Sequence, residues 1–294
     1  MNNSMISAMS SMNGLQQRLD ILANNIANVN TAGYKRKEAS FQDVLTTVQN
    51  QTDEFNEANR LTPLGLPQGW GSRLVLQQTD FSQGTLQQTD HPYDVALNGK
   101  GLFEVAVPVT DANGNTAMQR AFTRSSAMQL VPYGQQTALA DASGNVFVRA
   151  DGQPAIVPDN RRIEIDAFGN IQAYNDHSGE APENLGQLKV VAVDKPELLQ
   201  PVGENLYIVP VDANTGMQML GVITDPADNL NVTQAQVMQA YGISVHQGYV
   251  EQSNVDMAKE MTDLISIQRA YQLNARALSS ADTLMNLANN LRGS

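Results

Sequence analysis

Apolar residues recur every seven positions at both ends of the chain, and this repeat constrains the fold more than any other feature. In the first zone the two rows of the repeat are Met5, Met12, Leu19 and Ile26, and Ala8, Leu15, Leu22 and Val29. This spacing keeps an apolar seam facing a partner helix, although a core helix of a globular domain fits the pattern equally well. We expect a helix over residues 1–31 that ends at Thr31-Ala32-Gly33, because glycine accepts the left-handed conformation found just past helix ends.

The last zone, residues 252–291, repeats this design. One row holds Met257, Leu264, Tyr271, Leu278 and Met285. A second row starts with Met261 and Ala275, is broken by Gln268, and later shifts to Ala281 and Ala288. Two such helices at opposite ends of one chain can pair with each other. We therefore expect the termini to lie together in coiled-coil-like helices, each roughly 45 to 60 Å long at 1.5 Å per residue.

Charged residues are almost absent from the N-terminal zone. Between Met1 and Gly33 only Arg18 and Asp20 are charged. A solvated helix face normally carries charges, including supporting pairs one turn apart. The amides and hydroxyls found here instead indicate a helix that is surrounded by other protein on several sides.

The centre of the chain reads as short strands separated by turns. The turn sequences are Asn98-Gly99, Asn113-Gly114, Ser143-Gly144-Asn145, Asp151-Gly152 and Gly169-Asn170. They separate β-prone runs at residues 74–76, 146–148, 163–165, 188–193 and 206–209. Because such turns reverse the backbone, we predict an α+β fold with a mostly antiparallel β domain between the paired terminal helices.

The expected domain boundaries follow from this division. Residues 1–35 and 252–294 form a terminal helical assembly domain, residues 71–231 form the β-rich domain, and residues 36–70 and 232–251 are linking segments. Pro63, Pro67 and three glycines make residues 50–72 an extended linker that need not be ordered in isolation. A fragment of residues 71–231 is then expected to fold by itself.

Composition excludes several classes of function. The formal net charge is −12, whereas a nucleic-acid-binding protein needs a basic face. The chain has no cysteine and therefore no disulfide. No stretch is apolar enough for a bilayer span, and residues 1–5 lack the positive region and apolar block of a cleavable signal peptide. We expect neither nucleic-acid binding nor membrane insertion. If the protein leaves the cytoplasm, we expect an export route that does not recognise a cleavable signal peptide.

The sequence contains no recognisable catalytic, metal-binding or phosphate-binding motif. The three histidines, His91, His177 and His246, are scattered and fit no metal-binding spacing. Residues 111–115 resemble the start of a calcium loop, but Thr116 and Phe122 stand where glycine and glutamate are required. Residues 98–101 lack the full phosphate-loop pattern. We therefore predict no catalytic residue, no cofactor, no metal site and no enzymatic activity.

Two sequence blocks next to the helices carry a family resemblance. Residues 23–35 read Ala-Asn-Asn-Ile-Ala-Asn-Val-Asn-Thr-Ala-Gly-Tyr-Lys, and residues 248–256 read Gly-Tyr-Val-Glu-Gln-Ser-Asn-Val-Asp. They resemble the signatures of the flagellar rod, hook and hook-associated axial proteins, in the expected order. The matching motif positions are Asn24, Asn25, Asn28, Asn30, Gly33, Tyr34, Gly248, Glu251, Ser253, Asn254 and Val255.

The middle of the chain resembles the same family more loosely. Residues 81–86, 94–103, 185–188 and 205–207 are similar to parts of its β domain, so the resemblance spans nearly the whole chain. The short central domain is more like the distal-rod members than the hook members. The segment from Phe122 to Met128 departs from the family, since it lacks the glycine and phenylalanine that often occur there.

The resemblance implies a structural subunit of the flagellar rod that stacks into a helical tube. Such a tube transmits motor torque and encloses the channel through which later subunits are exported. The implied partners are further copies of the chain, the proximal-rod and hook proteins, and the flagellar type III export apparatus; the implied location is the extracytoplasmic basal body. Alternatives are a hook or proximal-rod subunit and, in a different class, a secreted oligomeric adhesin or binding module.

The seam residues are then the expected assembly interface. They are Met5, Met12, Leu15, Leu19, Leu22, Ile26, Val29, Met257, Leu264, Tyr271, Leu278 and Met285. For the motif asparagines, both local capping within the chain and contact with neighbouring subunits remain open. Gly33 and Gly248 most simply permit backbone turns where the helices join the rest of the chain.

Overall fold

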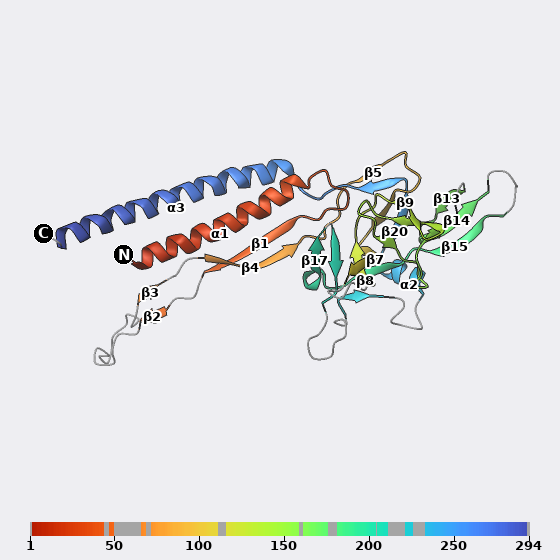
Figure 1. Ribbon diagram of the computed structural model, residues 1–294, viewed down its shortest axis with the longest axis horizontal. Helices are drawn as coiled ribbons and strands as arrows, with labels where there is room; N and C mark the ends of the chain where they lie inside the picture. Colours follow the sequence, from red (N-terminus) through yellow and green to blue (C-terminus); the bar gives the residue numbers. More distant parts are fainter. Residues whose placement is uncertain are drawn as a thin grey trace. The chain divides into compact units, whose positions relative to one another are not determined.

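The computed structural model of the chain describes residues 2–43, 47–49, 66–68, 72–110, 116–158, 161–175, 181–203, 205–210, 221–225 and 233–292. The chain forms two compact units (Figure 1). The helical unit contains Met1–Ala27, Lys37–Gln78 and Asp256–Ser294. The β-rich unit contains Asn28–Arg36 and Thr79–Val255. The predicted α+β class, with helices at both ends and a mostly antiparallel β body, is confirmed.

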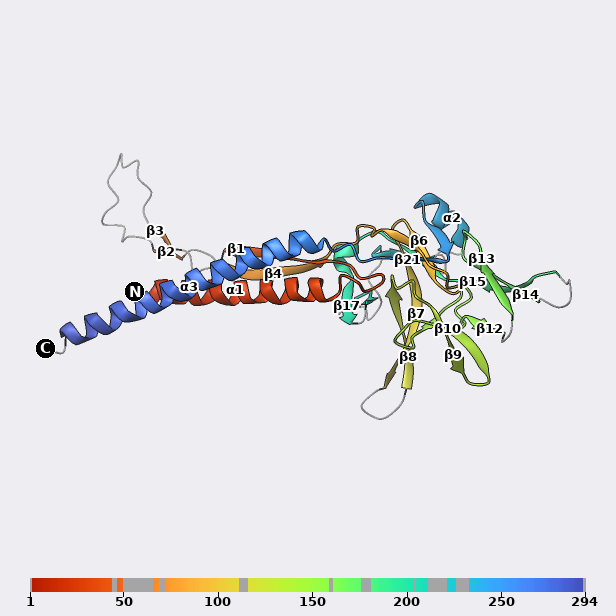
Figure 2. The ribbon, with the colours of Figure 1, turned by 90° about the horizontal axis from the view of Figure 1, so that it is seen from above.

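The helical unit is built on two long helices that lie side by side (Figures 1 and 2). They are α1 (Asn2–Ala27) and α3 (Met257–Arg292), about 39 and 54 Å long at 1.5 Å per residue. Strand β1 (Lys37–Asp43) packs on α1 and pairs with β4 (Ser72–Thr79). Strands β2 (Thr47–Gln49) and β3 (Leu66–Gln68) form a second antiparallel pair.

The first helix is shorter than its apolar repeat predicts. It ends at Ala27 rather than at residue 31, and the Asn28 carbonyl instead accepts a hydrogen bond from the Thr31 amide at 3.1 Å. Gly33 then takes the expected left-handed backbone, with φ of 69°. A side chain at this position would also bring its Cβ within 2.5 Å of the Arg124 carbonyl oxygen, so both the backbone angle and the space require glycine.

The main sheet of the β-rich unit has ten strands within the part of the chain that the structure describes. Its path runs through β12 (Ile156–Val157), β10 (Gln136–Ala140), β11 (Val146–Phe147), β7 (Gly101–Thr110), β8 (Thr116–Thr123), β18 (Leu206–Ile208) and β17 (Gln200–Gly203). Beside this path, β9 (Gln129–Tyr133) pairs with β10, and β16 (Val190–Val193) pairs with β7 and with β19 (Ile223–Thr224). Strands β13 (Arg162–Ile165), β14 (Asn170–Tyr174) and β15 (Glu183–Gln187) form a separate antiparallel sheet. A short 3₁₀ helix, η2, covers Pro196–Leu198.

Alternation along β7 divides the buried residues between two clusters. Successive side chains of a strand point to opposite faces. Phe103 therefore joins the larger core, where its ring meets Phe147 edge-on at 5.6 Å, while Leu102 joins a smaller core with Phe122 and Tyr207. Burying such side chains contributes roughly 1.5 to 3 kcal/mol each. The sheet is thus buried on both faces around β7.

Two hairpin turns in this unit have the same five-residue design. Asp141 and Asp166 each accept backbone hydrogen bonds from the residues two and four positions later, at 2.8 to 3.0 Å. The asparagine that ends each turn, Asn145 or Asn170, also donates its side-chain amide to the same carboxylate. These are the turns predicted at residues 143–145 and 169–170. The turn predicted at residues 113–114 lies outside the described residues.

Residues 232–251, expected as a linking segment, carry regular structure where they are described. Helix α2 (Gln234–Ala240) is capped by Thr233 and Gln236 in a reciprocal capping box. Strand β20 (Ser244–Gln247) pairs with β6 (Val95–Asn98), and β21 (Tyr249–Glu251) pairs with β5 (Leu86–Gln88). These residues belong to the β-rich unit, so that unit extends past residue 231. Within the expected extended linker, residues 50–65 and 69–71 lie outside the described residues.

This arrangement predicts how fragments of the chain behave. A fragment of residues 28–255 keeps the whole β-rich unit and should melt cooperatively as a monomer. A fragment of residues 28–231 loses α2, β20 and β21, and with them the buried Met238 and Val245, so it should lack a cooperative transition. Circular dichroism melts of the two purified fragments measure this. Equal cooperative melting of both would show that the C-terminal strands are not part of the folding unit.

Candidate assembly surface

Helix α3 turns one heptad face toward the interior of the helical unit. Positions of low exposure recur in steps of four and three, at Glu260, Leu264, Ile267, Tyr271, Asn274, Leu278, Ala281 and Met285, and Asp263, Ala270 and Ala275 beside them are half-buried. The predicted row from Leu264 to Met285 lies on this face. Of the predicted second row, Ala281 lies on this face and Ala275 is half-buried beside it. Met261 is 44% exposed, and the buried Glu260 takes its place on the inward face. Met257, at the first turn of the helix, is also exposed.

Helix α1 presents its predicted seam on a half-buried face. Met5, Ala8, Met12, Leu15, Leu19 and Ile26 are half-buried, and Leu22 is only 6% exposed. Val29 follows the end of the helix and is half-buried in the β-rich unit. Leu22 is thus already removed from water within one subunit. That these residues also contact another copy stays a prediction.

Asn25 fixes one end of the helix pair. Its side chain is 1% exposed and forms a two-way bridge to Lys37 of β1, since Nδ2 donates to the carbonyl at 3.0 Å and Oδ1 accepts from the amide at 2.9 Å. Nδ2 also donates to Oε2 of the buried Glu260 on α3 at 3.1 Å. Buried polar groups must be hydrogen-bonded, so this set permits one register of α1, β1 and α3.

The other motif asparagines differ from Asn25. Asn28 lies in the turn after α1, where its Oδ1 accepts a hydrogen bond from the Thr31 hydroxyl at 3.2 Å. Asn24 and Asn30 are exposed. A local role holds for Asn25 and Asn28, and for Asn24 and Asn30 both a local role and contact with a neighbouring subunit stay predictions.

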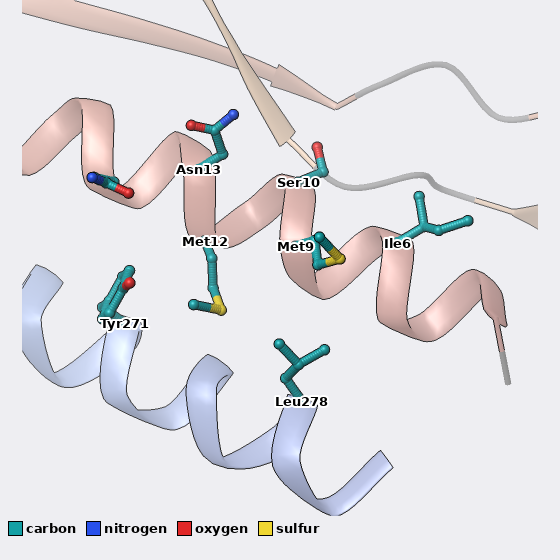
Figure 3. A pocket seen from close by; sticks show the side chains of 8 residues that line it. Ile6, Met9, Ser10, Met12, Asn13, Tyr271 and Leu278 are labelled. Carbon is teal, nitrogen blue, oxygen red and sulfur yellow. The ribbon is translucent and has the colours of Figure 1, made fainter. Parts of the chain in front are cut away.

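An open groove of about 710 Å³ runs between the two helices near the free end of α1. It is lined by Ile6, Met9, Ser10, Met12, Asn13, Gln16, Tyr271 and Leu278. Figure 3 shows Met12 pointing from α1 toward α3, where Tyr271 and Leu278 come up from the other side. Ile6 and Met9 are 44% and 59% exposed. The groove is therefore apolar and open to solvent in one subunit.

The second motif block is built around a buried ion cluster in the β-rich unit. The Glu251 carboxylate lies between two cations, with Lys35 Nζ at 2.7 Å from Oε1 and Arg124 Nε at 2.5 Å from Oε2. All three side chains are at most 4% exposed. The remaining donors and acceptors are satisfied by backbone: Lys35 donates to the Ser82 carbonyl, Arg124 to the Leu97, Gly99 and Gly101 carbonyls, and Oε1 of Glu251 accepts from the Gly84 amide.

This cluster joins five separate segments of the chain. The backbone adds to it, because the Gly33 amide donates to the Glu251 carbonyl at 2.8 Å and the Arg36 amide to the Asn254 side chain at 2.7 Å. Asn254 also donates to the Asp80 carbonyl, and the Glu251 amide donates to Ser126 Oγ. The segments that continue into α1 and α3 are thereby held side by side within the β-rich unit.

The remaining motif residues support this junction. Tyr34 and Val255 are buried, and Gly248 takes a left-handed backbone with φ of 74°. Ser253 Oγ accepts a hydrogen bond from the Val255 amide at 3.3 Å. Sequence reasoning gave Lys35 no role and noted Arg124 only within a departure from the family pattern. A signal was present for Arg124, which is the only charged residue between Arg120 and Asp141. Lys35 gave none, because Arg36, Lys37 and Glu38 follow it directly.

Burial shifts one titration in the cluster. Removal from water lowers the pKa of Lys35 below its ordinary value, and the Glu251 carboxylate opposes this by favouring the charged ammonium. Arg124 adds to the lowering by repulsion. Removing the negative charge of Glu251 would leave two buried cations facing each other, which is the costly arrangement for buried ions.

Two models of known protein families match the two ends of the chain. Residues 5–35 match the family model described as flagella basal body rod protein, and residues 246–291 match flagellar basal body rod FlgEFG protein C-terminal. The flagellar basal-body rod protein FlgG of Buchnera aphidicola subsp. Schizaphis graminum is 30% identical, over 92% of this chain and 92% of its own. The flagellar hook-basal body complex protein FlhP of Bacillus subtilis is 31% identical, over 98% of this chain and 99% of its own. FlgG of Agrobacterium fabrum is 31% identical over 95% of both chains.

This chain belongs to the flagellar basal-body rod protein family.

The two family-model matches of this rod-family chain coincide with the features described above. The first contains most of α1 with Asn25 and ends at Lys35, and the second contains Glu251 and nearly all of α3. Among the described residues, no group of three or more His, Cys, Asp or Glu side chains could hold a metal ion. Within the same residues, no helix is long and apolar enough to cross a membrane.

The ion cluster yields a prediction about stability and pH. Glu251→Gln should lower the free energy of unfolding at pH 7 by roughly 3 to 5 kcal/mol, because it leaves two buried cations without their carboxylate. The pKa of Lys35 should then fall further below 10.5. Between the folded and unfolded pKa values the unfolded state binds more protons, so stability should rise with pH through that window and recover partly by about pH 10.

Urea unfolding between pH 7 and 10 tests this prediction. The matched control is Glu183→Gln, whose carboxylate is 57% exposed and pairs with Arg161; it should change stability by less than about 1 kcal/mol. Equal losses for the two variants, or a Glu251→Gln variant whose stability falls toward alkaline pH, would contradict the role given to the cluster.

Adjacent asparagines provide a second comparison in this rod-family chain. Asn25→Ala removes the hydrogen bonds to Lys37 and Glu260 at a buried position and should destabilise the helical unit by roughly 1 to 3 kcal/mol. Asn24→Ala changes an exposed residue and should cost less than about 0.5 kcal/mol. Hydrogen exchange of α1 and α3 amides measures both. If the two variants exchange alike, Asn25 does not set the register of the pair.

Proposed function

We propose that this chain is a structural subunit of the flagellar rod, of the distal-rod type, which assembles with further copies into a helical tube. The open apolar groove between α1 and α3 carries the proposal. Large apolar side chains exposed to water mark interaction surfaces when they gather in one area. In the described residues most of them lie on the two long helices: Ile6, Met9, Met257, Met261, Ile265, Leu273, Leu284 and Leu287.

The charge pattern supports burial of the helices in an assembly. Over residues 2–27 only Arg18 and Asp20 are charged, so little desolvation cost opposes contact with other protein. A head-to-tail contact whose rotation does not close generates an open helical array. In the proposed tube the helices pair in a coiled-coil-like manner in the inner layer, and the β-rich unit lies outside.

The proposed role is mechanical rather than catalytic. The tube would transmit torque and enclose the channel for exported subunits, in the basal body outside the cytoplasm. Its proposed partners are further copies, the neighbouring proximal-rod and hook proteins, and the type III export apparatus, which would export the chain without cleaving a signal peptide. The names of FlgG and FlhP, which refer to the basal-body rod and the hook-basal body complex, support this class over a secreted adhesin.

Substitutions on the exposed part of the helices test assembly without disturbing the subunit. Met9→Asp places a charge in the groove and should abolish polymerisation, while the melt of the monomer stays unchanged because residue 9 is already exposed. The matched control is Gln17→Asp, which adds the same charge to an exposed position of α1 outside the groove and should polymerise far better. Leu22→Asp should instead destabilise the helix pair itself, since Leu22 is buried within one subunit.

Electron microscopy of concentrated purified protein measures the outcome. The unaltered chain and Gln17→Asp should form tubes or filaments, and Met9→Asp should remain monomeric. Closed rings from the unaltered chain, or polymers of Met9→Asp formed at the same concentration as those of the unaltered chain, would contradict the proposal.

A further inference from the structure

The two helices of the pair differ in length, and the difference falls at one end. Asn25 lies opposite Glu260 near one end, and Met12 lies with Tyr271 farther along, so the helices run antiparallel. Each step toward the start of α1 corresponds to one step toward the end of α3, so Asn2 lies opposite about residue 283. The last turns of α3, residues 284–292, therefore extend past the start of α1 as an overhang of roughly 13 Å. Figures 1 and 2 both show α3 continuing beyond the N-terminal end of α1.

The overhang carries apolar residues without a partner helix from its own chain. Leu284 and Leu287 are 59% and 57% exposed. Residues 283–291 contain no charged side chain, and the nearest charges are Asp282 and Arg292. An exposed helix end in a monomeric protein ordinarily carries charged residues. This composition suits a helix end that is covered by other protein.

The groove at the same end of the helical unit has matching chemistry. Its α1 wall, Ile6 to Gln16, contains no charged residue, and its α3 wall is Tyr271 and Leu278. Neither surface would bury an unpaired charge on contact with the other, which is the main cost of burying polar surface. The amides of Asn13 and Gln16 can hydrogen-bond along the rim.

The overhang of one chain cannot fill its own groove. Ile6 lies opposite about residue 279 in the antiparallel register, and Leu287 stands eight residues farther along, roughly 12 Å away. Helix α3 is continuous through these residues, so it cannot fold back. A second copy of this chain presents a short helix end that carries leucines and has no charge before Arg292, which matches the groove.

We propose that the α3 overhang of one subunit, through Leu284 and Leu287, docks into the α1–α3 groove of the next copy beside Ile6 and Met9. This inference rests on the proposed self-assembly and assigns the contact that carries it. The contact is heterologous, because overhang and groove are different surfaces, and it therefore propagates along a stack of copies. A stable interface of standard size uses about 20 to 30 residues a side, far more than the overhang offers. The contact alone leaves dilute subunits monomeric and becomes effective only when several neighbours contribute.

Cysteine cross-linking tests the contact directly, because the chain has no cysteine of its own. One chain carries Ile6→Cys and another carries Leu287→Cys; both positions are exposed, so both variants should keep the melt of the unaltered subunit. A disulfide needs Cα atoms within about 7 Å, which the two positions do not meet within one subunit. After mixing, polymerisation and oxidation with copper phenanthroline, disulfide-linked dimers should form between the two kinds of chain. A doubly substituted chain should give a ladder of longer products.

Two controls decide between the possible outcomes. Ile265 is an exposed apolar position on α3 away from the overhang, and Ile265→Cys in place of Leu287→Cys should give no dimer with Ile6→Cys. Truncation after residue 283 should keep the subunit melt yet raise the concentration needed for polymerisation about tenfold or more, because each buried leucine is worth roughly a factor of ten in an association constant.

Polymers that form without cross-links between positions 6 and 287, or that form equally well from the truncated chain, would overturn this contact while leaving the rod-subunit proposal intact. Dimers formed by Leu287→Cys alone in preference to the mixed pair would also overturn it, since they indicate a symmetric contact. Failure of the unaltered chain to polymerise under any condition would count against both proposals.

Discussion

One carboxylate between two buried cations holds the β-rich unit together. Glu251 neutralises Lys35 and Arg124 in a place that water does not reach, and the backbone carbonyls around them complete the coordination of both cations. No part of this set is stable by itself, since each charge needs its partners to offset the loss of hydration. Residues from both ends of the chain must therefore be present before the centre is complete. The segment that follows α1 and the segment that precedes α3 are kept together by this cluster.

The helical unit differs from the β-rich unit on its surface, but it too contains a buried polar contact. The exposed face of α1 is nearly uncharged and both helices expose large apolar side chains, whereas the interior contains the polar pair Asn25 and Glu260. A polar residue in an apolar seam reduces stability but excludes other registers. Asn25 also reproduces strand pairing with the Lys37 backbone, so the first strand after the helix has its position set by the helix itself.

The sequence predicted the features that arise from local repetition. Heptad spacing located both helices and the row from Leu264 to Met285, and glycine-containing turns located the hairpins at Asp141 and Asp166. It did not predict the end of α1, because the apolar repeat continues to Val29 while the chain has to turn back toward Lys37. It also placed Met261 on the inward face of α3, where Glu260 lies instead, because a pattern of apolar residues cannot detect an inward acidic side chain.

The ion cluster could not be predicted from the sequence for a related reason. Lys35, Arg124 and Glu251 are widely separated in the chain, and each alone resembles an ordinary surface charge. Only the fold brings them together, through pairings such as that of β21 with β5. Likewise α2 and β20 were assigned to a linking segment because short elements with mixed polarity give weak periodicity. The motif asparagines were recognised as important, but their separate roles depend on where α1 ends.

The pairing of β20 with β6 has a consequence for the timing of folding. These strands, Ser244–Gln247 and Val95–Asn98, are about 150 residues apart along the chain, a separation that makes a contact slow to form. A chain that emerges N-terminus first, from a ribosome or from a narrow channel, presents β6 long before its partner exists. During that interval α1 is available and the β-rich unit is unfinished. The β-rich unit therefore cannot be completed until residues 244–247 have arrived, and a chain threaded through a narrow channel stays incompletely folded over most of its length.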